Sequence, residues 1–137
     1  MQPDRDIQME AQRWLRFASD DLESARLHLA TTLILPNQAC YHAQQSAEKA
    51  IKAVLIHKGI PFPRTHDLQA LSALLPPALA PLCANLDLAR LTVWIIAARY
   101  PSDVPDASIP QAHDAIATAT AIFERVRVVF SGSADAS

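Results

Sequence analysis

The spacing of apolar residues predicts helices along most of the chain. Apolar side chains recur at steps of three and four residues, which places them on one face of an α-helix. Between residues 6 and 31 this face consists of Leu15, Ala18, Leu22, Ala25 and Leu29. Between residues 37 and 58 it consists of Ala39, Ala43, Ala47, Ala50, Ile51 and Val54. We find no alternation of apolar and polar residues typical of a strand, so the pattern predicts an all-α protein.

Prolines divide this helical pattern into blocks. A proline inside a helix removes a hydrogen bond and clashes with the preceding turn, so clusters of prolines mark helix ends. The clusters are Pro36; Pro61 and Pro63; Pro76, Pro77 and Pro81; and Pro101, Pro105 and Pro110. The blocks between them predict long helices at residues 6–31, 37–58, 78–98 and 111–130. A short helix is predicted after Thr65 or Asp67, either of which can cap it.

Short loops between these helices predict an antiparallel up-and-down bundle of four long helices plus one short helix. Gly59 is placed to end the second helix in the left-handed conformation. A bend in the fourth helix near residues 85–88 stays open from the sequence. We assign a single domain to residues 6–130 and predict that 131–137, which are small and polar, form a flexible C-terminal tail.

Composition and charge narrow the class of protein. Half of the 137 residues are hydrophobic and 19% are charged, which is typical of a chain that folds. The formal net charge is −2, so any contact with RNA or nucleotide must come from a local site. The first ten residues lack the apolar segment of a secretory signal, and no apolar run reaches the roughly 20 residues of a membrane span. We therefore expect a cytoplasmic protein.

The residues that usually hold metals or cofactors are not grouped in this sequence. Cys40 and Cys83 are too far apart for a zinc or redox motif, and we expect both to be buried small hydrophobes. Asp20 and Asp21 are adjacent and so point in different directions on a helix. With only two glycines, the chain has no glycine-rich loop to cradle a triphosphate. The sequence predicts no metal site and no cofactor.

Candidate chemistry lies at the helix junctions. Gln45, Glu48, Lys49 and Lys52 share one sector of the second predicted helix, and Glu48 and Lys52 stand four residues apart, in the orientation that favours an ion pair. One interpretation is a solvated helix face, and the other is a binding site. Two further polar segments lie at other helix junctions: Thr65-His66-Asp67-Leu68 begins the predicted short helix, and Arg99-Tyr100-Pro101 ends the predicted fourth helix.

Two residues of these segments allow more than one role. His66 can contact a phosphate or base beside Arg64, or it can fix the loop by hydrogen bonds to backbone. Arg99 can bind a phosphate, interact with carbonyls at the helix C-terminus, or form an ion pair with Glu48. Tyr100 can pack against the core with its hydroxyl at the surface.

These segments, in this order and spacing, resemble those of stand-alone prokaryotic HEPN domains. The resemblance runs from about Trp14 to Val128, and the segment 18–25, Ala-Ser-Asp-Asp-Leu-Glu-Ser-Ala, is similar to the first helix of that family. It implies a dimeric helical bundle that binds nucleotide or RNA, with a small nucleotidyltransferase as companion in a toxin–antitoxin-like pair. The binding residues that we infer are Gln45, Glu48, Lys49, Arg64, His66, Arg99 and Tyr100.

Many HEPN domains are metal-independent endoribonucleases with an Arg-x(4–6)-His motif, and this chain departs from that pattern. None of its histidines has an arginine five to seven positions before it. Arg99 most resembles the motif arginine, but His113 lies fourteen residues beyond it. The leading hypothesis is therefore a binding module without this nuclease motif. The alternatives are an endoribonuclease that uses Arg99 with His66 or His113, and a structural adaptor without catalysis.

Overall fold

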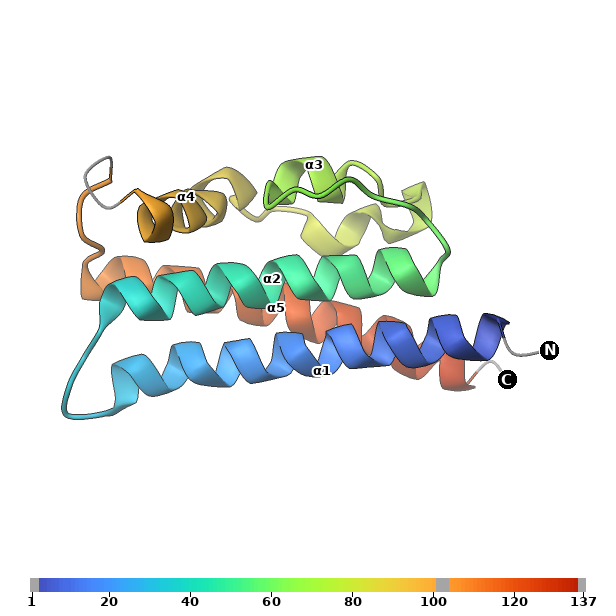
Figure 1. The fold of residues 1–137 in the computed structure, drawn as a ribbon, viewed down its shortest axis with the longest axis horizontal. Coiled ribbons are helices and arrows are strands. Elements are labelled where there is room, and N and C mark those ends of the chain that lie inside the picture. The colour runs from blue at the N-terminus through green and yellow to red at the C-terminus, as the bar shows by residue number, and fades with distance from the viewer. Residues whose placement is uncertain (1–2, 101–103, 136–137) are drawn as a thin grey trace.

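The computed structural model describes residues 3–100 and 104–135, and within these residues all regular structure is helical. Three long helices, α1 (Pro3–Ala30), α2 (Pro36–His57) and α5 (Ile109–Asp135), lie lengthwise beside one another. The short α3 (Leu68–Ser72), the 3₁₀ helix η1 (Pro77–Cys83) and α4 (Leu88–Arg99) lie along the side of α2 that faces away from α1 (Figure 1). The predicted all-α bundle is confirmed.

Helix α2 is the centre of the bundle and packs against α1, α3, α4 and α5. Its alanines Ala39, Ala43, Ala47, Ala50 and Ala53 are fully buried. Because alanine has a small side chain, neighbouring helices approach α2 closely from several sides. At the crossing with α1, the hydroxyl of Ser46 donates a hydrogen bond of 2.8 Å to the carbonyl of Ala18.

Local sequence sets where each helix begins and ends. Gly59 has a φ of 69° and ends α2, as predicted. Backbone hydrogen bonds from Ile60 to Leu55 and from Gly59 to Ile56 complete the Schellman motif at this end. Helix α5 begins with a capping box, in which Ser108 and Gln111 each accept a hydrogen bond from the other's backbone N–H.

The predicted fourth helix, residues 78–98, is divided. Its first part is the 3₁₀ helix η1, and its second part is α4, at an angle of 64° to η1. The helix is interrupted because Asn85 adopts a φ of 63° and because Asp87 caps the N-terminus of α4 through a 3.0 Å hydrogen bond from Arg90 N. The sequence did not decide whether this helix bends near residues 85–88, and the structure shows that it is broken there into two helices.

The C-terminal helix is longer than predicted. Helix α5 continues to Asp135, so it includes five of the seven residues assigned to the tail 131–137, and residues 136–137 lie outside the described part of the chain. No single helix in the described residues is long and apolar enough to cross a membrane, although the bent pair of η1 and α4 reaches the necessary length and apolarity.

Candidate functional site

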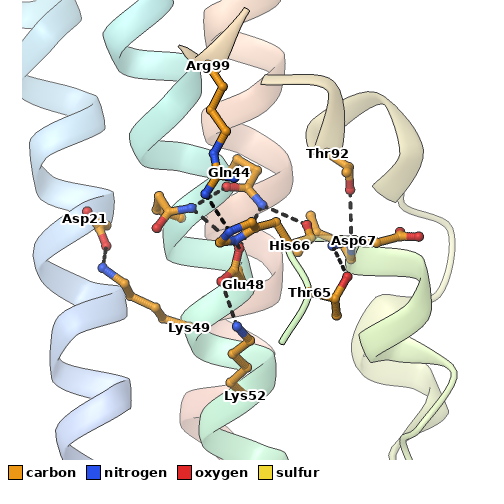
Figure 2. Close-up of polar contacts among 12 residues, drawn as sticks. Asp21, Gln44, Glu48, Lys49, Lys52, Thr65, His66, Asp67, Thr92 and Arg99 are labelled. Carbon is orange, nitrogen blue, oxygen red and sulfur yellow. Dashed lines mark hydrogen bonds and ion pairs between the residues drawn. The ribbon is translucent and has the colours of Figure 1, made fainter. Parts of the chain in front are cut away.

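A buried carboxylate, Glu48, lies on the side of α2 that faces α3 and α4 (Figure 2). Only 4% of the residue is exposed. Its Oε2 accepts a 2.8 Å hydrogen bond from Lys52 Nζ, and its Oε1 lies 2.8 Å from His66 Nδ1. Lys52 is itself buried, so this pair is internal and the interpretation as a solvated helix face was wrong.

These partners keep Glu48 ionised. Burial alone would raise the pKa of this carboxyl group, because a charged group loses hydration inside the protein. Hydrogen bonds from Lys52 and His66, together with the positive charge of Lys52, outweigh that effect and lower the pKa of Glu48 below its ordinary value of 4.5. Glu48 is therefore a fixed negative charge at the base of the site.

The loop between α2 and α3 holds His66 over this carboxylate. The backbone carbonyl of His66 accepts a 3.2 Å hydrogen bond from Gln44 Nε2. The next residue, Asp67, caps α3 through the backbone N–H of Gln69, and Leu68 N donates to Thr92 Oγ1 of α4. His66 is thus fixed between α2 and α4 by contacts on both sides.

The second ring nitrogen of His66 meets Arg99, the last residue of α4. Arg99 Nη2 lies 2.9 Å from His66 Nε2. Because a guanidinium only donates hydrogen bonds, Nε2 must accept this one. The proton of the neutral imidazole is then on Nδ1, which donates to Glu48. The three side chains form one chain of hydrogen bonds from the buried carboxylate to the exposed guanidinium (Figure 2).

The possible ion pair between Arg99 and Glu48 is not formed, because the imidazole of His66 lies between the two groups. Arg99 makes no other hydrogen bond or ion pair within the described residues. Tyr100 is 59% exposed, so the interpretation in which it packs against the core was also wrong. Pro101 lies outside the described residues.

Of the other predicted site residues, one joins the hydrogen-bond network around Glu48 and the rest lie outside it. Gln45 joins the network, since its Nε2 donates to Gln44 Oε1 at 2.7 Å. Lys49 turns to the opposite side of α2 and pairs with Asp21 of α1 at 2.5 Å (Figure 2). Arg64 is exposed on the loop that carries His66. His113 is exposed on α5, and within the described residues no contact joins it to Arg99.

The binding residues predicted from sequence leave out two members of the network, Gln44 and Lys52. Gln44 is fully buried, and its amide nitrogen donates to Glu48 Oε1 at 3.2 Å as well as to the backbone of His66. Its position four residues before Glu48 was the available signal, because residues at that spacing are neighbours on a helix. Lys52 was recognised as a partner of Glu48 but was not assigned to the site.

The charges of this cluster favour an anion at its exposed edge. Glu48 and Lys52 neutralise each other inside the protein, and the guanidinium of Arg99 remains as a positive charge at the surface. In the described residues no three His, Cys, Asp or Glu side chains are grouped as metal ligands. A hollow between α4 and α5, lined by Arg90, Trp94 and Gln111 among others, contains none of the predicted site residues.

Comparison with known proteins agrees with this fold. The model of the HEPN domain family matches residues 11–129. A crystal structure described as that of an archaeal HEPN homologue is 28% identical in sequence, with a TM-score of 0.62 over 85% of this chain and 94% of that chain. No curated protein matches the chain.

Proposed function

The chain belongs to the HEPN domain family, and from this membership and the polar site we propose that it binds nucleotide or RNA through a phosphate group. The phosphate would contact the exposed guanidinium of Arg99 beside the imidazole of His66. The observation that carries this proposal is the 2.9 Å contact between these two side chains, with the buried Glu48 behind them. A planar guanidinium held in place suits recognition of phosphate oxygens.

Isothermal titration with ATP, GTP and short RNAs tests this proposal. We expect at least one of these ligands to bind, and we expect Arg99→Ala to weaken its binding. Arg90→Ala is the matched control, because Arg90 is also an exposed arginine of α4. The proposal would be rejected if no ligand bound at millimolar concentration, either to the purified protein or to its complex with a companion.

We further propose that the chain forms a homodimer and partners a small nucleotidyltransferase in a toxin–antitoxin-like pair. The family resemblance supports the proposal of a nucleotidyltransferase partner. Two exposed apolar residues of α4, Val93 and Ile96, and the exposed Tyr100 directly after this helix are consistent with a protein interface. Sedimentation at micromolar concentration tests the dimer. Co-purification with a nucleotidyltransferase encoded nearby tests the pair, and separate elution of the two proteins would contradict it.

An endoribonuclease activity is the second candidate, and the orientation of His66 favours it. The carboxylate on Nδ1 holds the histidine in the tautomer whose Nε2 can act as a general base once the Arg99 guanidinium turns from it to the phosphate. Arg99 would stabilise the phosphate charge. RNA cleavage in the presence of EDTA, lost in both His66→Ala and Arg99→Ala but retained in His113→Ala, is the expected result. Cleavage unchanged in the first two variants would reject this site.

A further inference from the structure

The hydrogen bond between Arg99 and His66 has a consequence for any anion that binds there. In the free protein Nε2 of His66 carries a lone pair, which Arg99 satisfies at 2.9 Å. When a phosphate accepts the hydrogen bond of Arg99 Nη2 in place of His66 Nε2, the lone pair of Nε2 is left facing phosphate oxygens, which are also acceptors. Two acceptors facing each other repel, and a proton on Nε2 converts that repulsion into a hydrogen bond.

We propose that this site takes the terminal phosphate of a phosphomonoester, and that His66 takes up one proton from the solvent as the phosphate binds. This inference rests on the proposed function and names the class of ligand. In the bound state Nδ1–H of His66 would still donate to Glu48, and Nε2–H would donate to the phosphate beside Arg99.

The charges of the site match those of a terminal phosphate. Glu48 and Lys52 cancel, so Arg99 and a protonated His66 together supply two positive charges. A phosphomonoester carries about −1.5 to −2 at neutral pH. An internal phosphodiester of RNA carries only one negative charge, so it would leave one of the two cations without compensation. A terminal phosphate is therefore the better match for the protonated site.

The groups around the imidazole come from two helices and its own loop. Glu48 Oε1 of α2 lies 2.8 Å from Nδ1 and Arg99 Nη2 of α4 lies 2.9 Å from Nε2, so a carboxylate and a guanidinium flank the ring. Lys52 acts through its ion pair with Glu48. Arg64 precedes His66 by two residues on the loop and is exposed, and within the described residues no contact joins it to the imidazole. Glu48 is thus a positioning residue for His66 and need not touch the ligand.

Calorimetry with a matched pair of ligands tests this inference. The RNA dinucleotide ApA is compared with its 5′-phosphorylated form at pH 7, in two buffers that differ in ionisation enthalpy. We expect the phosphorylated form to bind about tenfold more tightly or better, a difference of about 1.4 kcal/mol. We also expect the uptake of up to one proton for that ligand only. AMP and inorganic phosphate, run in parallel, separate recognition of the phosphate from recognition of the nucleoside.

Variants show whether His66 is the group that takes up the proton. His66→Gln keeps a polar side chain but cannot titrate, so the preference for the phosphorylated dinucleotide and the proton uptake should both be lost. His113→Gln should retain both. Equal affinity for the two dinucleotides, or no proton uptake in the wild type, would overturn this inference and leave the proposed function standing. If neither dinucleotide nor any of the other ligands binds, the proposed function itself fails.

Discussion

His66 and Arg99 are 33 positions apart in the chain, and their side chains meet at 2.9 Å. This contact fixes the tautomer of the histidine, because the guanidinium can only donate. It also connects the buried Glu48 to the surface through a single imidazole. Glu48 is buried and Arg99 is exposed, so one end of the cluster can stabilise the fold while the other end binds a ligand. Substitutions at the two ends should therefore have different effects.

Arg99 should matter for binding more than for stability. Its side chain is exposed, and exposed charged contacts contribute about 1 kcal/mol or less to stability. Arg99→Ala should therefore lower the free energy of unfolding by no more than that in urea titrations. Loss of a charged hydrogen bond to phosphate should weaken ligand binding by about tenfold to a hundredfold. The structural adaptor hypothesis predicts the reverse, a loss of stability with no effect on any ligand.

Glu48 should matter for stability, and its contribution should depend on pH. The folded-state pKa of Glu48 lies below its ordinary value of 4.5, so the stabilisation is fully present above about pH 4.5 and is lost as the pH falls through the folded-state value. Glu48→Gln should cost about 3 kcal/mol at pH 7, because it leaves Lys52 buried without its partner. The difference from wild type in urea unfolding should shrink below pH 4.5.

Glu124→Gln is the matched control for this prediction. Glu124 pairs with Arg127 at the surface, where both side chains are about half exposed. We expect a change of less than 1 kcal/mol and no comparable dependence on pH. A wild-type-like stability of Glu48→Gln at pH 7 would contradict the burial and pairing described for Glu48.

Lys49 should contribute to the contact between α1 and α2 and not to the binding of a ligand. It pairs with Asp21, whose other oxygen lies 3.0 Å from His42 Nδ1. Lys49→Ala should lower stability by about 1 kcal/mol and change ligand affinity less than threefold. A double-mutant cycle with Asp21→Asn should recover the pair energy. A tenfold loss of affinity in Lys49→Ala would place Lys49 in the site after all.

The two cysteines should be unreactive in the folded protein. Burial raises the pKa of Cys40 to about 12 and also raises that of Cys83, so little of the reactive thiolate exists at pH 8. A thiol reagent such as 5,5′-dithiobis(2-nitrobenzoate) should label neither residue in native protein and both in 6 M guanidinium chloride. Rapid labelling of the native protein would show that one of the two is accessible.

The helical fold could be predicted from sequence because its determinants are local. The apolar spacing of 6–31 and 37–58, the prolines and Gly59 each act over a few residues, and the structure confirms the all-α bundle. The break between η1 and α4 was harder to predict. It depends on Asn85 adopting a left-handed conformation, which asparagine tolerates but does not require.

The partners of the polar residues could not be predicted in the same way. The spacing of Glu48, Lys49 and Lys52 predicted one shared sector of the helix, yet Lys49 turns to Asp21 of α1 while Lys52 turns to Glu48. That choice depends on which helix lies on each side of α2, and so does the position of His66 between Glu48 and Arg99. Periodicity places a residue on a helix face, but the neighbouring helices determine what it contacts.

Nitrogen-15 NMR of the His66 imidazole is the most direct test of the chain from Glu48 through His66 to Arg99. In the free protein at pH 7 we expect a neutral ring protonated on Nδ1, with the chemical shift of an acceptor at Nε2. Saturation with the 5′-phosphorylated dinucleotide should shift both nitrogens to the values of a doubly protonated ring. A free protein with the proton on Nε2, or a ring unchanged by the bound ligand, would contradict the account.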